Sequence, residues 1–253
     1  MIRTVQVGKY KLYADDGSDM PEDIRDLTGL KILQNGINFE RHVYEELRRL
    51  MPDCHGFLDL GSNVGLYTIA ARDLHSTVPI VAVEASFINT QLLLKSLVEN
   101  GIEGVTVINH PVANYPRIIN VSRENKINVT CATGLSRDTA WEYAQAFPMD
   151  FFNLPPINLI KMDIEGFEYL ALLGMSRLLT KKPAIIFEYC PQMCPRSGLK
   201  NPIELLEYLI SIGYKLTVLD YIPNTRKTFT DATECHNYMV SVSQWITDIL
   251  AEQ

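Results

Sequence analysis

The chain has 253 residues, of which 47% are hydrophobic and 21% charged, and its 23 basic and 30 acidic residues give a formal charge of −7. This composition excludes a disordered chain, a collagen-like repeat and a short disulfide scaffold, and the charge argues against nucleic acid or anionic lipid as a partner of the whole chain. Five scattered cysteines, and apolar stretches far shorter than the roughly 20 residues of a bilayer helix, predict a cytoplasmic protein without a membrane segment.

The first 35 residues predict a small β-hairpin or lid. Val5, Val7, Tyr10 and Leu12 alternate with polar residues, which is typical of a half-buried strand. From residue 38 the apolar positions fall on one helical face, and this pattern predicts a helix that leads into the first core strand.

From residue 56 onward, short apolar runs alternate with amphipathic segments, which favours repeated βα units and a mostly parallel sheet. The expected strands are residues 56–60, 80–84, 105–109, 157–162, 184–189, 216–220 and 238–242. The expected helices between them are residues 64–74, 87–99, 167–179 and 201–213. Residues 113–156 interrupt the alternation and predict a hairpin followed by a return strand near residues 147–151.

No repeat, low-complexity tract or linker divides the chain, so we expect a single domain. Its parts are an N-terminal hairpin or lid over residues 1–35, a catalytic core over 36–242, and a C-terminal helix over 243–253. The helix is expected because apolar residues between Trp245 and Leu250 recur at helical spacing.

The turn at residues 61–65 is the most informative segment. A strand runs through Gly61 and Gly65 into a helix, an arrangement that lets a nucleotide ligand approach the backbone. A dinucleotide fingerprint would need glycine where Asn63 and Leu66 stand, and the signature of a phosphate-binding P-loop is absent. The spacing therefore favours a nucleotide ligand without pyrophosphate. The alternative is that the glycines only form a tight turn.

Acidic residues close two other predicted strands. Glu84 stands where a carboxylate accepts hydrogen bonds from ribose hydroxyls. Asp163 and Glu165 follow the strand at residues 157–162, where carboxylates orient a substrate, take a proton or hold a metal. Glu168 favours the start of a helix by its charge.

Together these residues carry a family resemblance. The turn Asp-Leu-Gly-Ser-Asn-Val-Gly at 59–65, Glu84, and Ile-Lys-Met-Asp-Ile-Glu-Gly-Phe-Glu at 160–168 resemble the FkbM family of S-adenosylmethionine-dependent methyltransferases. The resemblance covers residues 36–242 and implies the α/β class I methyltransferase fold, a seven-stranded, mostly parallel, Rossmann-like sheet with helices on both faces. It also implies S-adenosylmethionine as cofactor, S-adenosylhomocysteine as product, and O-methylation of a small molecule, glycan or secondary metabolite.

The resemblance also assigns roles to residues. Those expected at the cofactor are Asp59, Gly61, Ser62, Asn63, Gly65, Glu84, Ala85, Pro111, Val112 and Asp163. Among them, Glu84 would hold the ribose, and Pro111 and Val112 would lie near the adenine. An alcohol acceptor needs a base, for which Asp163 and Glu165 are the first candidates and His110 and Glu188 the next.

Several alternatives stay open. Mg²⁺ held by Asp163 and Glu188 is less favoured, because no local cluster of acidic ligands supports it, and no metal is expected. A non-catalytic module that binds S-adenosylmethionine or S-adenosylhomocysteine and acts through partners is a second reading. A nicotinamide-dependent oxidoreductase is disfavoured by Asn63 and Leu66. The acceptor itself would be selected by residues 1–35, 113–156 and 190–201.

Overall fold

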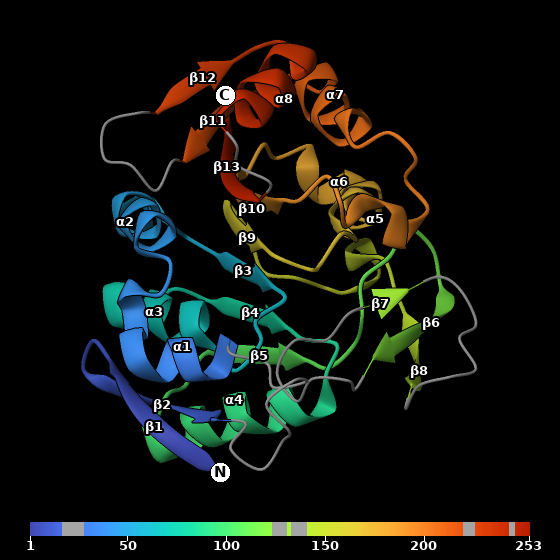
Figure 1. Ribbon diagram of the computed structural model, residues 1–253. Helices are drawn as coiled ribbons and strands as arrows, with labels where there is room; N and C mark the ends of the chain where they lie inside the picture. Colours follow the sequence, from blue (N-terminus) through green and yellow to red (C-terminus); the bar gives the residue numbers. More distant parts are fainter. Residues whose placement is uncertain (17–27, 123–130, 133–140, 220–225, 243–245) are drawn as a thin grey trace.

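Eight strands form the central sheet, and most of them are short apolar runs that are buried on both sides. Their bounds are β3 (Phe57–Leu60), β4 (Ile80–Val83), β5 (Val105–Ile108), β9 (Leu159–Met162), β10 (Ala184–Tyr189), β11 (Lys215–Leu219), β12 (Lys227–Phe229) and β13 (Thr247–Glu252). In the computed structural model, which describes residues 1–16, 28–122, 131–132, 141–219, 226–242 and 246–253, neighbouring strands follow the order β12-β11-β13-β10-β9-β3-β4-β5 (Figure 1). The five strands from β10 to β5 are parallel, whereas β13 is antiparallel to both of its neighbours.

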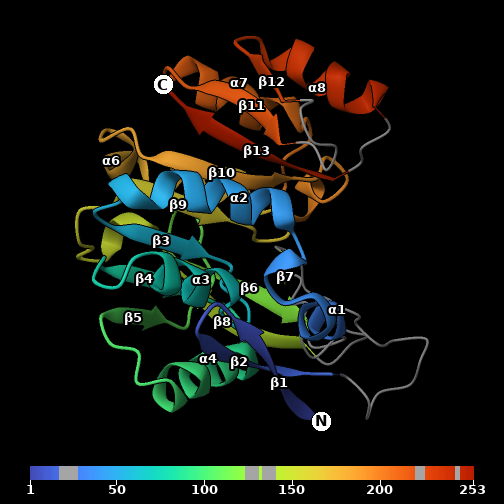
Figure 2. The ribbon, with the colours of Figure 1, turned by 90° about the vertical axis from the view of Figure 1, so that its left-hand side faces the viewer.

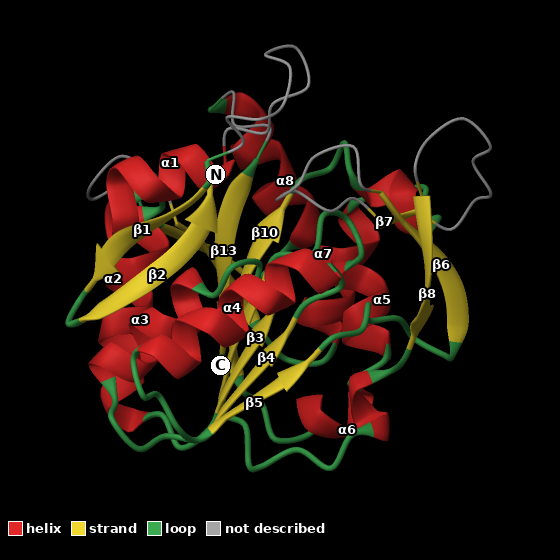
Figure 3. Ribbon diagram, turned by 90° about the horizontal axis from the view of Figure 1, so that it is seen from below, coloured by secondary structure: helices red, strands yellow, loops and turns green. Residues whose placement is uncertain are grey.

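Helices cover both faces of this sheet. The α-helices are α1 (Thr28–Asn35), α2 (Arg41–Leu50), α3 (Leu66–Leu74), α4 (Phe87–Glu99), α5 (Glu168–Leu173), α6 (Ser176–Leu179), α7 (Ile203–Ser211) and α8 (Ala232–Ser241). Short 3₁₀ turns are η2 (Gly36–Asn38), η3 (Met51–Asp53), η4 (Met149–Phe151) and η5 (Cys194–Ser197). Helices α1 to α3 lie on one face and α5 to α7 on the other (Figure 3). None of the described helices has the length and apolar character needed to cross a bilayer.

Side chains alternate along the strands and so divide the core in two. Phe57 and Leu159 belong to the apolar cluster beneath α2 and α3. Leu58 and Ile160, one residue further on, belong to the cluster that contains residues of α5, α7 and α8. This alternation fixes which strand residues share the face covered by α2 and α3.

Two smaller sheets flank the central one. β1 (Ile2–Val7) and β2 (Tyr10–Asp15) form an antiparallel hairpin, and β2 lies against α4, where the backbone N–H of Tyr13 donates to Ser96 Oγ at 3.0 Å. The other sheet has the order β7-β6-β8, from β6 (Arg117–Ser122), β7 (Cys131–Ala132) and β8 (Trp141–Ala146). A return strand was predicted near residues 147–151, but the strand that returns to pair with β6 is β8, at residues 141–146. Residues 149–151 form the 3₁₀ turn η4 instead, and Pro148, whose fixed φ suits the start of a turn, precedes it.

The end of the chain departs most from the sequence prediction. Residues 238–242 were expected to form a strand, but residues 238–241 lie in α8. The Asp231 side chain caps this helix by accepting from the Glu234 N–H at 2.8 Å, and Cys235 and Met239, four residues apart, face the core.

The C-terminal helix expected over residues 243–253 is also wrong, because β13 occupies residues 247–252. This strand lies between β10 and β11 (Figure 2), and five of its six residues are buried. A strand buried on both faces has no polar alternation to reveal it in the sequence. β13 takes the place of the predicted seventh strand, and β12 adds an eighth strand at the edge of the sheet.

Candidate active site

The turn after β3 has an unusual backbone. Gly61, Asn63 and Gly65 all have positive φ, at 77°, 50° and 97°. Asparagine tolerates this region better than most residues, and glycine adopts it freely. The N–H groups of Gly61 and Ser62 both donate to the carbonyl of Val83, at 2.9 and 3.0 Å, so the turn is tied to the end of β4.

Glu84 follows β4 and is aimed at this turn. Its Oε2 accepts from the backbone N–H of Asn63 at 2.9 Å, and its Oε1 accepts from the N–H of Ser86 at 2.8 Å. Burial raises the pKa of this carboxyl, which is 6% exposed, to about 7. A carboxylate fixed in this way retains lone pairs for the hydroxyl donors of a ligand.

Several acceptor atoms near the turn are buried but have no hydrogen-bond partner within the described residues: Asp59 Oδ1, Ser62 Oγ and Asn63 Oδ1. Buried polar atoms are usually paired, so unpaired acceptors at one turn indicate a donor-bearing ligand. Asp59 is completely buried, its Oδ2 accepts from Thr68 Oγ1 at 2.6 Å, and burial raises its pKa to about 6.

The turn after β9 supplies the second group of acids. Asp163 Oδ2 lies 2.9 Å from Lys161 Nζ. Glu165 has a φ of 58° and pairs with Arg196 at 3.2 Å, whereas the buried Glu168 accepts from the N–H of Ile164 and so shapes the turn itself. Burial raises the pKa of Glu168 to about 7. A non-glycine residue with a positive φ, such as Glu165, has a strained backbone conformation, and such strain often marks a functional site.

These two turns border one cavity of about 240 Å³ at the carboxyl ends of β3, β4 and β9. The predicted site residues that line it are Gly61, Ser62, Asn63, Glu84, Ala85, His110, Pro111, Val112, Asp163 and Glu165. Asp59 and Gly65 lie outside its wall. His110 is exposed, and its ring lies nearly perpendicular to that of Phe147, with 5.3 Å between the ring centroids.

Sequence reasoning overlooked three polar residues of the same cavity: Glu40, Tyr67 and Lys161. They come from the segment before α2, from α3 and from β9, and each resembles an ordinary helix or strand residue in its own segment. Burial, reinforced by Asp248, raises the pKa of Glu40 to about 7. Glu188, one of the candidate bases, also lines the cavity, and burial together with Asp163 raises its pKa to about 11.

The described residues contain no group of three or more His, Cys, Asp or Glu side chains arranged to hold a metal ion. The donor set at the two turns consists instead of single carboxylates held by backbone N–H groups, Lys161 or Arg196. This arrangement suits an organic ligand with several hydrogen-bond donors.

The strand order, with an antiparallel β13 and a cavity at the carboxyl ends of the parallel strands, defines a class I methyltransferase fold. The crystal structure of the methyltransferase FkbM from Methylobacillus flagellatus KT has a TM-score of 0.53 and 18% identity to this chain. It covers 92% of this chain, which spans only 56% of that protein. A structure from Staphylococcus aureus, whose description proposes a caffeoyl-CoA O-methyltransferase, has a TM-score of 0.50 and 11% identity, covering 88% of this chain and 92% of that one.

A comparison with protein families matches residues 59–216 to the methyltransferase FkbM domain, which is more than half of the chain. The chain therefore belongs to the FkbM methyltransferase family. The predictions of family and fold class are confirmed. A comparison with curated proteins found no match.

Proposed function

We propose that this protein binds S-adenosylmethionine in the cavity and transfers its methyl group to a hydroxyl of a small molecule, glycan or secondary metabolite. The observation that carries the proposal is the convergence of acceptors at one turn: Ser62 Oγ and Asn63 Oδ1 lack donors within the described residues, and the Glu84 carboxylate, bound to the Asn63 N–H, lines the same cavity. The ammonium and ribose hydroxyls of S-adenosylmethionine are donors of the matching kind.

The remaining cofactor candidates fit around this core of acceptors. Glu84 would hold the ribose, and Ala85, Pro111 and Val112 offer an apolar wall for the adenine. Asp59 and Gly65, which lie outside the cavity wall, would support the turn without contacting the cofactor. When bound, the cofactor supplies a methyl group that the sulfonium already activates. The protein then has to align the acceptor with the methyl group and exclude water.

Asp163 is the favoured base, because its carboxylate borders the cavity directly after β9. Its Oδ2 is bound by Lys161, and within the described residues its Oδ1 has no hydrogen-bond partner. Glu165 is a weaker candidate, since its carboxylate is paired with Arg196. Glu188, with a pKa of about 11, keeps its proton at neutral pH and is better suited to donate a hydrogen bond.

The test starts from Asp163→Ala, with Glu103→Gln as a control at an exposed carboxyl group. We expect Asp163→Ala to leave the affinity for S-adenosylhomocysteine, measured by calorimetry, within a few fold, and to lower methyl transfer by about 100-fold or more. Transfer is followed with a labelled methyl group in a metabolite extract, and mass spectrometry identifies the product. Full transfer by Asp163→Ala would refute its role, and binding without transfer by the unaltered protein would support a non-catalytic module.

We also infer a cytoplasmic location and no nucleic-acid partner. Four cysteines, Cys54, Cys190, Cys194 and Cys235, are free and buried, as is usual in a reducing compartment. The net charge of −7 supports the second inference, because the phosphate backbone attracts basic surfaces.

A further inference from the structure

Polar side chains replace the expected apolar ones on one face of the central sheet. On the face covered by α2 and α3, four neighbouring strands contribute apolar residues to one cluster, which are Phe57, Leu159, Ile186 and Leu250. Two positions along the same strands, and therefore on the same face, stand Asp59, Lys161, Glu188 and Asp248. These residues are neighbours across the sheet: Asp59 is the register partner of Lys161, and Glu188 is that of Asp248.

Lys161 lies at the centre of this polar group. Its side chain is only 3% exposed, and its Nζ lies 2.9 Å from Asp163 Oδ2 and 5.0 Å from the centre of the Tyr67 ring. The Tyr67 hydroxyl in turn donates to Glu40 Oε2 at 2.6 Å. The ammonium thus connects β9, α3 and the segment before α2 at the wall of the cavity.

An ammonium in the middle of a buried strand needs an explanation. Removing such a charge from water costs several kcal/mol, and a well-packed apolar residue at a comparable site is often equally stabilising. Parallel strands buried on both faces normally carry Val, Ile or Leu at such positions. The requirements of the fold therefore do not account for Lys161, whereas its place beside Asp163 gives it a chemical use.

We propose that Lys161 is a positioning residue of the methyl-transfer site, which holds Asp163 Oδ2 so that Oδ1 faces the acceptor, and which places a buried positive charge beside that carboxylate. This inference rests on the proposed function. Lys161 itself transfers no proton and forms no bond to the acceptor.

The charged and titratable groups around Lys161 are consistent with this role. They are Asp59 on β3, Tyr67 on α3, Glu40 before α2, Asp163 after β9 and Asp248 on β13. Burial lowers the pKa of Lys161, but the four carboxylates outweigh burial and raise it above its ordinary value, so the side chain stays charged. For Glu40 the effect is reciprocal, since Lys161 lowers the pKa that burial and Asp248 raise.

The experiment compares Lys161→Met and Lys161→Arg with Lys181→Met, a control at an exposed lysine. For each variant we measure circular dichroism, S-adenosylhomocysteine affinity by calorimetry, and the rate of labelled methyl transfer from pH 5.5 to 9.5. We expect Lys161→Met to bind S-adenosylhomocysteine within about threefold of the unaltered protein, to lose about 100-fold in rate, and to move the acid limb of its pH profile up by about one unit. Lys161→Arg should recover at least about a tenth of the rate with the acid limb in its original place, because it restores the charge.

A double-mutant cycle separates positioning from general stability. If Lys161 acts through Asp163, Lys161→Met should slow the Asp163→Asn variant by less than about threefold. A rate and pH profile of Lys161→Met equal to those of the unaltered protein, or a full additional loss in the Asp163→Asn background, would overturn the proposal. If Lys161→Met does not fold, Lys161→Gln keeps a donor without the charge, and an unmoved acid limb in that variant would overturn it equally. Failure of the unaltered protein to bind S-adenosylhomocysteine would instead refute the proposed function.

Discussion

Two features of its surroundings require glycine at position 61: a positive φ and the close approach of a neighbouring backbone. Residues with a Cβ rarely adopt its φ of 77°, and a Cβ at this position would lie 1.7 Å from the carbonyl oxygen of Asp163. The close approach brings the ends of β3 and β9 together, and with them the turn and Asp163. Gly101 has a similar φ of 61°, but no atom lies within 4 Å of such a Cβ. A substitution there therefore tests the effect of the positive φ without the steric clash.

Gly61→Ala should therefore do more damage than Gly101→Ala. We expect Gly101→Ala to lower the free energy of unfolding by about 1 kcal/mol, which is the cost of a left-handed residue with a Cβ, and to leave cofactor binding unchanged. Gly61→Ala should lower the free energy of unfolding by more than about 3 kcal/mol and abolish S-adenosylhomocysteine binding, because the added Cβ would force the backbone at Asp163 to move. Urea unfolding and calorimetry measure both quantities, and equal losses in the two variants would contradict this account.

The sequence indicated those residues of the candidate site that directly follow a strand. Gly61, Glu84 and Asp163 each directly follow an apolar strand, and parallel strands bring such positions to one edge. Lys161, Glu40 and Tyr67 gave no comparable signal. Their significance arises only when three separate elements pack together, and a lone lysine in a strand does not indicate which carboxylates will surround it.

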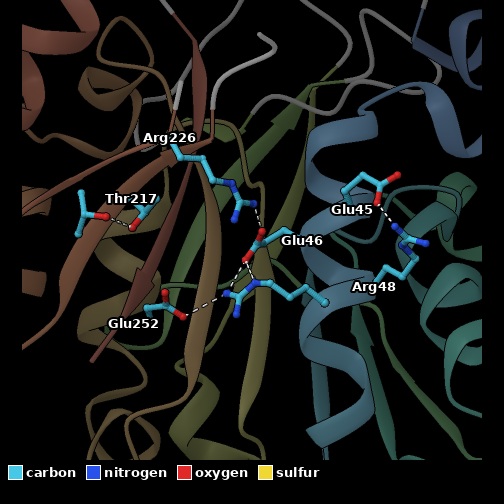
Figure 4. Close-up of polar contacts among 8 residues, drawn as sticks. Glu45, Glu46, Arg48, Thr217, Arg226 and Glu252 are labelled. Atoms are coloured by element: carbon cyan, nitrogen blue, oxygen red, sulfur yellow. Dashed lines mark hydrogen bonds and ion pairs between the residues drawn. The ribbon is translucent and has the colours of Figure 1, made fainter. Parts of the chain in front are cut away.

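At the scale of elements, a cluster of charges fixes α2 to the edge of the sheet (Figure 4). Glu46 on α2 is only 1% exposed, and its carboxylate is bound by Arg226, which lies just before β12, and by Arg49. Arg49 also reaches Glu252 on β13 at 3.2 Å. The neighbouring Glu45 instead pairs with Arg48 on the exposed side of the helix.

Glu46→Gln should consequently destabilise the protein, whereas Glu45→Gln should not. We expect a loss of about 1–3 kcal/mol in the free energy of unfolding for Glu46→Gln, because a buried charged acceptor is removed from two arginines. An exposed pair contributes at most about 0.5 kcal/mol, so Glu45→Gln serves as the matched control. Denaturant unfolding measures both variants. Indistinguishable midpoints would show that the Glu46 cluster does not stabilise the packing of α2.

Among the elements, the sequence predicted the central βα units well and the end of the chain poorly. The helix predicted at 87–99 and the strand predicted at 184–189 match α4 and β10, because in each segment the length and the apolar periodicity indicate the same kind of element. Helix α8 was missed although Asp231 and Glu234 have the spacing of a helix cap, since the apolar residues near Val240 resemble a short strand. For β13, burial on both faces left only the apolar spacing, which fits a helix equally well.

At the scale of the whole molecule, buried carboxyl groups make stability depend on pH. Burial raises the pKa of Asp59 to about 6, and the pKa values of Glu84 and Glu168 to about 7. A folded pKa above the unfolded value stabilises the protein fully below pH 4 to 5, and this contribution is lost as the pH rises through about 7. The free protein should thus be harder to unfold at pH 5.5 than at pH 8.

Glu84→Gln tests this dependence. At about 1.4 kcal/mol per pKa unit, Glu84 alone accounts for at most about 3 kcal/mol of the change, so the variant should be more stable than the unaltered protein at pH 8 and similar at pH 5.5. Glu99→Gln, at a half-exposed carboxyl group, should follow the unaltered protein at both pH values. Urea unfolding at the two pH values measures the difference. If Glu84→Gln loses as much stability between pH 5.5 and pH 8 as the unaltered protein does, another group is responsible for the pH dependence.

The position of β13 has a consequence for biosynthesis. This strand follows β11, β12 and α8 in the sequence yet lies between β10 and β11 in the sheet. While the polypeptide is still emerging from the ribosome, β10 and β11 each lack the partner that will separate them, and both expose backbone groups that attract other chains. The nascent protein therefore cannot complete its sheet until residue 252 has been translated, and until then the unpaired edges of β10 and β11 are sites at which other chains can associate.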